Sequence, residues 1–213
     1  MRVITYNIHA GVNRENIPTL LKICKYLKKS RADVICLQEV IYPDYLVLKK
    51  KLRMRGVFAE NAKKGPSPYG ICTFVRKKSF CHHHFFLTSK GEQRGALCVT
   101  FDNANGYTSV INTHLGLNEE ERRTQMDEIS NYVSSLVGNK IICGDFNEKN
   151  VVLSPYGDFA LLTGEDGLTT FYPSNARIDY IFADSQMIPM RYEVENIKLS
   201  DHYPVIADCE KRI

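Results

Sequence analysis

Residues 140–147 read Lys-Ile-Ile-Cys-Gly-Asp-Phe-Asn, an apolar run that breaks off into a carboxylate and an amide. The run predicts a β-strand over Lys140–Phe146 that is buried on both faces, because consecutive positions are apolar. A buried carboxylate without a partner is strongly destabilising, so a position chosen only for packing would not hold Asp145. The segment therefore indicates a buried sheet with a chemically active group at the end of one strand.

Seven further segments have the composition of strands, and most of them also contain polar residues at or near one end. The predicted strands are Arg2–Ile8, Asp33–Val40, Gly70–Arg76, Ala96–Asp102, Tyr107–Leu115, Arg177–Ala183 and Tyr203–Cys209. Their polar residues include Asn7, Glu39, His114, Asp179 and, just before the last strand, Asp201-His202. Because ligands gather where strand ends and their loops meet, we expect these side chains to share one site.

Three segments show the signals of helices. The first is predicted to begin at an Asn16 cap, with Leu20, Leu21, Cys24 and Leu27 as its buried stripe. The second follows Asn118, carries acidic residues in its first turn, and ends before Gly138. A shorter helix is expected over Pro43–Arg55. Strands outnumber helices, so the class is mixed α and β with a large sheet content.

The chain has 213 residues, of which 44% are hydrophobic and 24% charged, as in an ordinary globular protein. This favours a single domain over residues 1–213. No apolar run approaches the roughly 18 residues of a membrane span, so we expect no integral membrane association. Seven cysteines cannot all pair with one another, and several lie in apolar runs as buried thiols do. The N-terminus shows no signal peptide, so we predict a cytoplasmic location. We also expect the protein to be a monomer.

The charge is unevenly distributed along the chain. Residues 22–90 hold 16 basic and 4 acidic side chains, although the whole chain carries a net charge of only +4. Such runs are usually the solvated faces of helices. They also suit a surface that attracts phosphate-rich partners, including nucleic acid. The sequence leaves both interpretations open.

The polar residues at the strand ends form a recognisable set of ligands. Carboxylates are offered by Glu39, Asp145, Asp179 and Asp201, and amide oxygens by Asn7 and Asn147. Oxygen ligands of this kind suit Mg²⁺ or Mn²⁺. A carboxylate that accepts a hydrogen bond from His202 would set the tautomer of its ring and support the imidazolium. A metal, a positioned carboxylate and histidines together favour hydrolysis of a phosphoester.

Six motifs in order resemble the endonuclease/exonuclease/phosphatase superfamily, which includes DNase I. They are Thr5-Tyr6-Asn7-Ile8, Leu37-Gln38-Glu39-Val40, Asn112-Thr113-His114-Leu115, Gly144-Asp145-Phe146-Asn147, Arg177-Ile178-Asp179-Tyr180-Ile181-Phe182 and Ser200-Asp201-His202-Tyr203-Pro204-Val205. The resemblance spans nearly the whole chain. It implies an α+β fold with four layers, in which two mixed β-sheets pack face to face and helices cover the outside.

The resemblance also implies roles for single residues. Glu39 is similar to the family's metal-binding glutamate, with Asn7 beside it and Asp201 at the same metal site. Asp145 resembles the aspartate that orients or deprotonates the attacking water, and Asn147 the amide that holds the phosphate or the nucleophile. His202 resembles the histidine that contacts the phosphate or acts as base, and Asp179 resembles its carboxylate partner. His114 resembles a second histidine that contacts a phosphate oxygen or assists the leaving group.

Two positions bear on the substrate. His9 and His114 stand where the apurinic-endonuclease branch has other residues, which argues against cleavage at abasic sites. Arg94 either reaches a second phosphate or is an ordinary surface arginine. The first interpretation is a phosphodiesterase or phosphomonoesterase that requires Mg²⁺ or Mn²⁺.

A DNA endonuclease or exonuclease of the same superfamily is the alternative, and a non-catalytic phosphate-binding module is a lesser one. A zinc site built on Cys81 and the three histidines that follow it is a further alternative. It is disfavoured because consecutive strand residues point to opposite faces.

Overall fold

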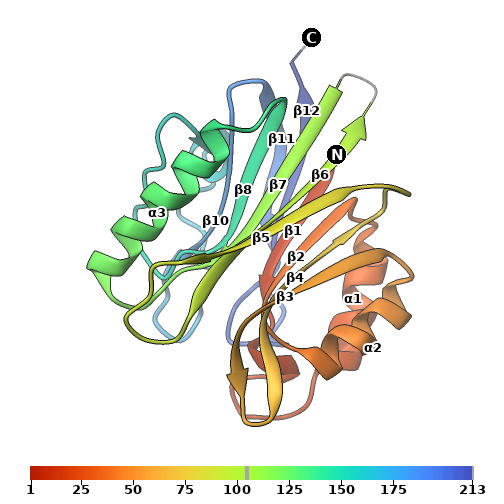
Figure 1. The fold of residues 1–213 in the computed structure, drawn as a ribbon. Helices are drawn as coiled ribbons and strands as arrows, with labels where there is room; N and C mark the ends of the chain where they lie inside the picture. The colour runs from red at the N-terminus through yellow and green to blue at the C-terminus, as the bar shows by residue number, and fades with distance from the viewer. Residues whose placement is uncertain (104–105, 213) are drawn as a thin grey trace.

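Two mixed six-stranded sheets form the centre of the computed structural model, which describes residues 1–103 and 106–212 (Figure 1). The first sheet contains, in spatial order, β11 (Met187–Val194), β12 (Val205–Lys211), β1 (Arg2–Asn7), β2 (Val34–Ile41), β4 (Ser67–Val75) and β3 (Arg55–Lys64). The second contains β5 (Cys81–Leu87), β6 (Arg94–Asn103), β7 (Gly106–His114), β8 (Asn139–Asp145), β10 (Asp179–Ala183) and β9 (Gly157–Asp158).

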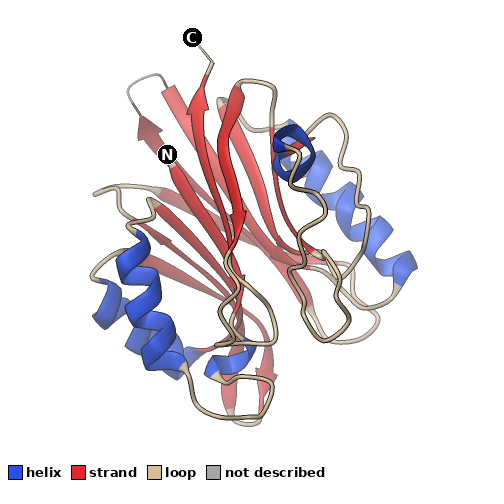
Figure 2. Cartoon of the chain, turned by 180° about the vertical axis from the view of Figure 1, so that it is seen from behind, coloured by secondary structure: helices blue, strands red, loops and turns tan. Residues whose placement is uncertain are grey.

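Helices cover the outer faces of the two sheets, as Figure 2 shows. The helices of the described residues are α1 (Leu20–Ser30), α2 (Tyr42–Leu52), α3 (Glu119–Ser134), α4 (Phe159–Thr163) and the short 3-10 helix η1 (His9–Gly11). Helices α1 and α2 pack on the first sheet, and α3 packs on the second (Figure 1). The four-layer α+β sandwich is therefore confirmed. None of the described helices is long and apolar enough to cross a lipid bilayer.

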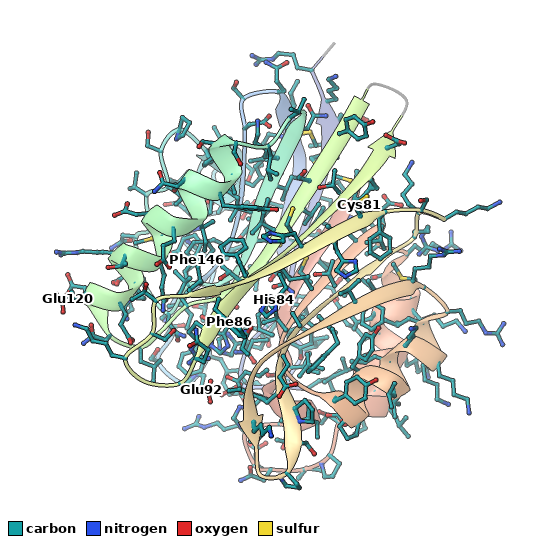
Figure 3. The ribbon with its side chains drawn as sticks, viewed as in Figure 1. Cys81, His84, Phe86, Glu92, Glu120 and Phe146 are labelled. Carbon is teal, nitrogen blue, oxygen red and sulfur yellow. The ribbon has the colours of Figure 1, made fainter. Side chains whose placement is uncertain are left out.

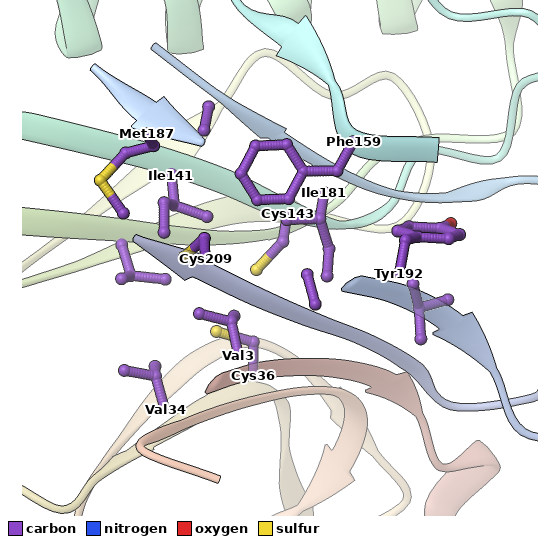
Figure 4. Close-up of a cluster of buried hydrophobic side chains, with 14 of the residues drawn as sticks. Val3, Val34, Cys36, Ile141, Cys143, Phe159, Ile181, Met187, Tyr192 and Cys209 are labelled. Carbon is purple, nitrogen blue, oxygen red and sulfur yellow. The ribbon is translucent and has the colours of Figure 1, made fainter. Parts of the chain in front are cut away.

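The inner faces of the two sheets bury the central core, part of which Figure 4 shows. Val3 and Val34 of the first sheet meet Ile141, Cys143 and Ile181 of the second, as the alternation of strand side chains requires. The core becomes polar toward one end of the strands. There, Gln38 Nε2 donates across the interface to Asn112 Oδ1 at 2.7 Å. This hydrogen bond joins the two sheets directly beneath the polar strand ends.

Two pairs of parallel strands bring those ends together. β1 runs parallel to β2 in the first sheet, and β7 runs parallel to β8 in the second. Asn7 closes β1, His114 closes β7 and Asp145 closes β8. His114 and Asp145 are direct neighbours in the β7–β8 register, and Asp179 of β10 faces Asp145 from the other side. Carboxyl ends of strands from both sheets thus meet at one end of the sandwich.

All eight predicted strands are present, but the sequence did not reveal four others. β3 and β5 are edge strands with a single fully buried side chain each, so they show no long apolar run to indicate them. β11 is an edge strand whose register shifts between Pro189 and Arg191, and β9 is only two residues long.

The predicted start of the first helix is wrong. Asn16 adopts a left-handed backbone with φ of 59°, and Pro18 pairs with Val12 in a β-bridge, so the helix begins only at Leu20. One member of its predicted stripe, Leu21, is 64% exposed, and Ile23 is buried instead. In α3, by contrast, the Asn118 side chain accepts a hydrogen bond from the Glu121 N–H, as a capping residue does.

We expect Gly144→Ala to destabilise the fold by about 3 kcal/mol or more, because two unfavourable effects add. Gly144 has φ of +147°, and a Cβ atom there would lie 1.9 Å from the Thr113 carbonyl oxygen on β7. Gly91→Ala is the matched control, since no atom lies within 4 Å of its added Cβ. Denaturant unfolding of the two variants measures the difference. Equal stability of the two variants would show that β7 and β8 can move apart at Thr113 and Gly144 without loss of stability.

Candidate active site

Asn7 links the acidic groups of the two sheets. Its Nδ2 donates to Glu39 Oε1 and to Asp145 Oδ2, both at 3.0 Å, while its Oδ1 accepts from the backbone N–H of His9. The Ser200 hydroxyl donates to the Asn7 carbonyl oxygen at 2.8 Å, which ties the loop before β12 to the same point. The buried amide therefore holds two carboxylates in place and presents its N–H groups to both of them.

A bulge in β2 turns Glu39 into the site. The register with β4 shifts between Leu37 and Val40, and Glu39 adopts a left-handed backbone with φ of 53°. Bulges commonly re-aim a side chain beside an active site. Burial opposes ionisation of Glu39, but the contacts with His9, the neighbouring His114 and the bond from Asn7 outweigh it. The pKa of Glu39 therefore lies well below its usual range, and the side chain is a carboxylate.

Asp201 approaches the same point from the loop before β12. His9 Nδ1 lies 3.5 Å from Glu39 Oε2 and 3.6 Å from Asp201 Oδ2. The contact with Glu39 raises the pKa of His9, burial opposes this, and the charge of Asp201 adds to it. The two carboxylates are therefore spaced to share one positive charge.

His202 forms a buried pair with Asp179. Its Nδ1 donates to Asp179 Oδ2 at 2.8 Å, and its Nε2 lies 3.6 Å from Asp145 Oδ2. The Phe171 ring covers the imidazole, with centroids 4.7 Å apart. Burial lowers the pKa of His202, but the charges of Asp179 and Asp145 outweigh it and raise the pKa to about 10. His202 is therefore an imidazolium at neutral pH.

His114, unlike His202, is neutral. Its Nδ1 lies 3.2 Å from an amino nitrogen of Arg94, and its Nε2 lies 3.6 Å from Asp145 Oδ2. Because a guanidinium only donates, Nδ1 accepts and the ring proton sits on Nε2. Burial and the charge of Arg94 lower the pKa of His114 to about 3. A neutral and a charged histidine therefore approach the same oxygen of Asp145.

Asp145 lies at the centre of these contacts and is almost fully buried. Burial raises its pKa, the charge of His202 opposes this, and the carboxylate of Asp179 adds to the rise. The Asn147 N–H donates to Asp145 Oδ1 at 2.9 Å, and the Asn147 side chain donates to the Leu115 carbonyl at 2.9 Å. Asn147 therefore braces the loop that follows Asp145.

Ten residues were predicted for the site, and the structure connects them through a single network of contacts. Arg94 does not lie on the open surface, because its side chain is buried between His114 and Glu92. Sequence reasoning missed Phe171, and it also missed Thr170, whose hydroxyl accepts from the Asp179 N–H at 3.1 Å. Both lie in an irregular segment without a strand or helix pattern. Only their closeness to Arg177–Ala183 along the chain could have indicated them.

Two groups of side chains have the composition of a cation site. Among the described residues, Asp145, Asp179 and His202 have ligand atoms within 4.8 Å of one another. In this trio His202 Nδ1 already donates to Asp179 Oδ2 at 2.8 Å, so the imidazole and that carboxylate are occupied with each other. Glu39 and Asp201 offer hard oxygen donors, which Mg²⁺ and Mn²⁺ prefer. The second pair therefore fits a divalent cation better.

The histidines of β5 do not converge on one ion. His83 stacks on Tyr132 with ring centroids 5.3 Å apart, whereas His84 Nε2 lies 2.8 Å from Asn61 Oδ1 on the other face of the strand. Their divergence follows from the alternation of side chains along a strand. It gives no support to the zinc alternative.

Comparison with known proteins agrees with this fold. The sequence profile of the Endonuclease/Exonuclease/phosphatase family matches residues 4–202. Among solved structures, an endonuclease/exonuclease/phosphatase from Bacteroides vulgatus aligns with TM-score 0.82 and 21% identity over 99% of this chain and 98% of its own. D. rerio TDP2 complexed with single strand DNA product aligns with TM-score 0.81 and 19% identity over 99% of each chain.

A mannosyl-6-phosphatase from Bacteroides thetaiotaomicron aligns with TM-score 0.78 and 18% identity over 99% of each chain. These low identities establish the fold alone. No curated protein matches the sequence significantly. The profile match and the sandwich together define the class of hydrolases that act on phosphoesters, which contains nucleases and phosphatases. The chain belongs to the Endonuclease/Exonuclease/phosphatase family.

Proposed function

We propose that the protein hydrolyses a phosphodiester, or a phosphomonoester, by in-line attack of a water molecule, and that it requires Mg²⁺ or Mn²⁺. One observation carries this proposal: a charged His202 and a neutral His114 both lie 3.6 Å from the same oxygen of Asp145. Such a centre provides a proton acceptor for water beside two N–H donors for phosphoryl oxygens.

The roles follow from these contacts. Asp145 accepts the proton of the attacking water as the new P–O bond forms. His202, held by Asp179, and the Nε2–H of His114 donate to phosphoryl oxygens, whose negative charge grows as the water attacks. As the P–O bond to the ester oxygen breaks, that oxygen takes the electron pair and accepts a proton from the imidazolium of His202. Asn147 orients the Asp145 loop and the nucleophile. Arg94 is a positioning residue, because it sets the tautomer of His114.

Glu39 and Asp201 would hold the divalent cation, with Asn7 fixing the Glu39 carboxylate. When bound, the cation would polarise a phosphoryl oxygen and offset its charge. We also propose that residues 1–213 act as one catalytic domain, because the site takes side chains from Asn7 to His202 and from both sheets. The monomeric state and the cytoplasmic location stay predictions.

An activity panel on the purified protein tests the proposal. Bis-p-nitrophenyl phosphate, p-nitrophenyl phosphate, single- and double-stranded DNA, abasic DNA and inositol phosphates are compared with Mg²⁺, with Mn²⁺ and with EDTA, and His202→Ala serves as the control. Metal-dependent turnover that His202→Ala abolishes would confirm an enzyme and exclude the non-catalytic phosphate-binding module. Turnover unaffected by His202→Ala would overturn the assignment of the site.

The lysines of α1 and α2 give the nuclease alternative little support. Lys28 and Lys29 lie in the last turn of α1, and Lys49, Lys50 and Lys51 lie in the last turn of α2. α1 ends where β2 begins, and α2 starts where β2 ends. These lysines therefore gather at the end of the sandwich opposite the site, where they complement the negative ends of the helix dipoles. They do not form a track that leads to Asp145.

We expect Glu39→Gln to raise the metal concentration needed for half-maximal activity by at least about 10- to 100-fold. Changes to residues around metal ligands already have effects of that size. Glutamine keeps the shape of the side chain but removes the negative charge that Glu39, together with Asp201, offers to a cation. Glu210→Gln, on an exposed position of β12, is the control. A metal titration of initial rates gives the comparison, and an unshifted midpoint would count against a ligand role for Glu39.

A further inference from the structure

A row of side chains crosses the second sheet at the level of the site. Asp179 faces Asp145, and Asp145 faces His114. On β6, Ala96 faces Thr113, so the preceding residue, Gly95, comes level with His114. Gly95 in turn pairs with Phe86 of β5. Residues in one row share a face of the sheet, so Phe86 lies on the face that carries His114 and Asp145.

The spacing of this row suits a substrate of defined length. Neighbouring strands lie about 4.8 Å apart, so the backbone of Phe86 lies about 10 Å from that of His114. This span is comparable with the length of a nucleoside from its phosphate to its base. A phosphate bound at His114 and His202 would therefore place an attached base near Phe86.

Gly95 lies between the two positions, and the Asn61 and His84 side chains occupy the space that a side chain at Gly95 would fill. A Cβ atom on Gly95 would lie 2.4 Å from Asn61 Oδ1 and 2.8 Å from His84 Nε2. These two atoms are hydrogen-bonded to each other at 2.8 Å. Asn61 reaches them because β3 has a bulge between Glu60 and Ala62. The missing side chain of Gly95 thus allows Asn61 to fix the His84 ring.

His84 supports Phe86 from one side only. The two rings meet edge to face, with centroids 5.0 Å apart and an interplanar angle of 74°, and Figure 3 shows both on β5. Phe86 is nevertheless 62% exposed. On the opposite face of β5, Phe85 packs on Tyr132 of α3 with centroids 4.6 Å apart, which anchors the strand. Phe86 is therefore a braced aromatic ring with a large free surface.

We propose that Phe86, supported by His84, is a stacking platform for a nucleobase attached to the scissile phosphate. The inference rests on the proposed function and narrows its substrate to a short nucleotide phosphodiester with an unpaired base. Stacking of a base on an aromatic side chain is worth about 1–3 kcal/mol and tolerates any base. Phe86 would therefore favour substrates with a planar ring but would not distinguish one base from another.

The test measures substrate preference. A dithymidine phosphodiester is compared with the same compound in which both thymines are removed, and bis-p-nitrophenyl phosphate supplies a planar ring that is not a base. In the wild type, kcat/KM is expected to be higher for the base-bearing compound. Phe86→Ala is expected to reduce that preference about tenfold, mainly through KM, because stacking holds substrate and transition state alike. Phe86→Trp is expected to restore it.

Tyr107→Ala is the matched control, because Tyr107 is 53% exposed and lies at the opposite end of β7 from His114. Its preference is expected to match that of the wild type. If Phe86→Ala loses about tenfold in kcat/KM on dithymidine alone, the ring that stacks on Phe86 is a nucleobase. If it loses as much on the p-nitrophenyl ester, Phe86 accepts any planar ring.

Equal efficiency of the wild type on the base-bearing and base-free compounds would overturn the platform and leave the proposed function standing. No metal-dependent hydrolysis of any of the three compounds would overturn both.

Discussion

Asp145→Asn is expected to lower kcat by about three orders of magnitude while leaving the fold intact. Proton transfer to a positioned base is typically worth about 10²–10⁴ in rate. The amide is nearly the same size, and its oxygen can still accept from Asn7 Nδ2, which now bonds to Asp145 at 3.0 Å. What is lost is the charge between His114 and His202 and the capacity to take a proton from water.

Steady-state kinetics with saturating metal measure this effect, and thermal unfolding shows that the variant is folded. Asp127→Asn is the control, because Asp127 is an exposed carboxylate on α3 and takes no part in the network of site contacts described above. If Asp145→Asn turned over substrate at the wild-type rate, Asp145 would not be the base. The proton would then have to leave through another group.

Asp179→Asn is expected to lower kcat by about 10³- to 10⁴-fold. In the serine-protease triad, the same change at a carboxylate that orients a histidine is worth about 10⁴. The carboxylate accepts the Nδ1–H of His202 at 2.8 Å. An asparagine amide can instead donate to Nδ1, which would move the ring proton to Nε2 and remove the positive charge. Phosphoryl oxygens would then meet a weaker donor.

The pH dependence separates this role from a merely structural one. Because the neighbouring carboxylates raise the pKa of His202 to about 10, against the effect of burial, the charged ring of the wild type persists from acid up to that pH. Loss of the Asp179 charge lowers the pKa, so the variant should lose the charged ring at a lower pH. A histidine titration followed by NMR, together with the pH–rate profile, measures the shift. An unshifted titration would contradict the pairing.

Much of the fold could be predicted because buried strands have a clear pattern. Lys140–Phe146 and Arg2–Ile8 are nearly continuous apolar runs, and such runs occur in strands covered on both faces. β3 and β5 escaped prediction because an edge strand is stabilised by its backbone bonds to one neighbour, which leave few marks on side-chain composition. The start of α1 escaped because the β-bridge between Val12 and Pro18 competes with a cap at Asn16.

The residues that the structure brings together at the candidate site could be predicted from the chain, but their charge states could not. Asn112-Thr113-His114 and Ser200-Asp201-His202 each place a histidine after polar residues, and neither motif shows which ring is charged. Residue types and their order along the chain are enough to predict the family and the layers, and they lead to the proposed set of ligands.

The charges of the two rings come from partners that only folding supplies. Arg94 reaches His114 from the neighbouring strand, and Asp179 reaches His202 from another. The cause is physical: the pKa of a buried group depends on desolvation and on charges a few ångströms away in space. The cross-strand row that links Phe86 to Asp145 arises in the same way, because the pairing register of separate strands sets it.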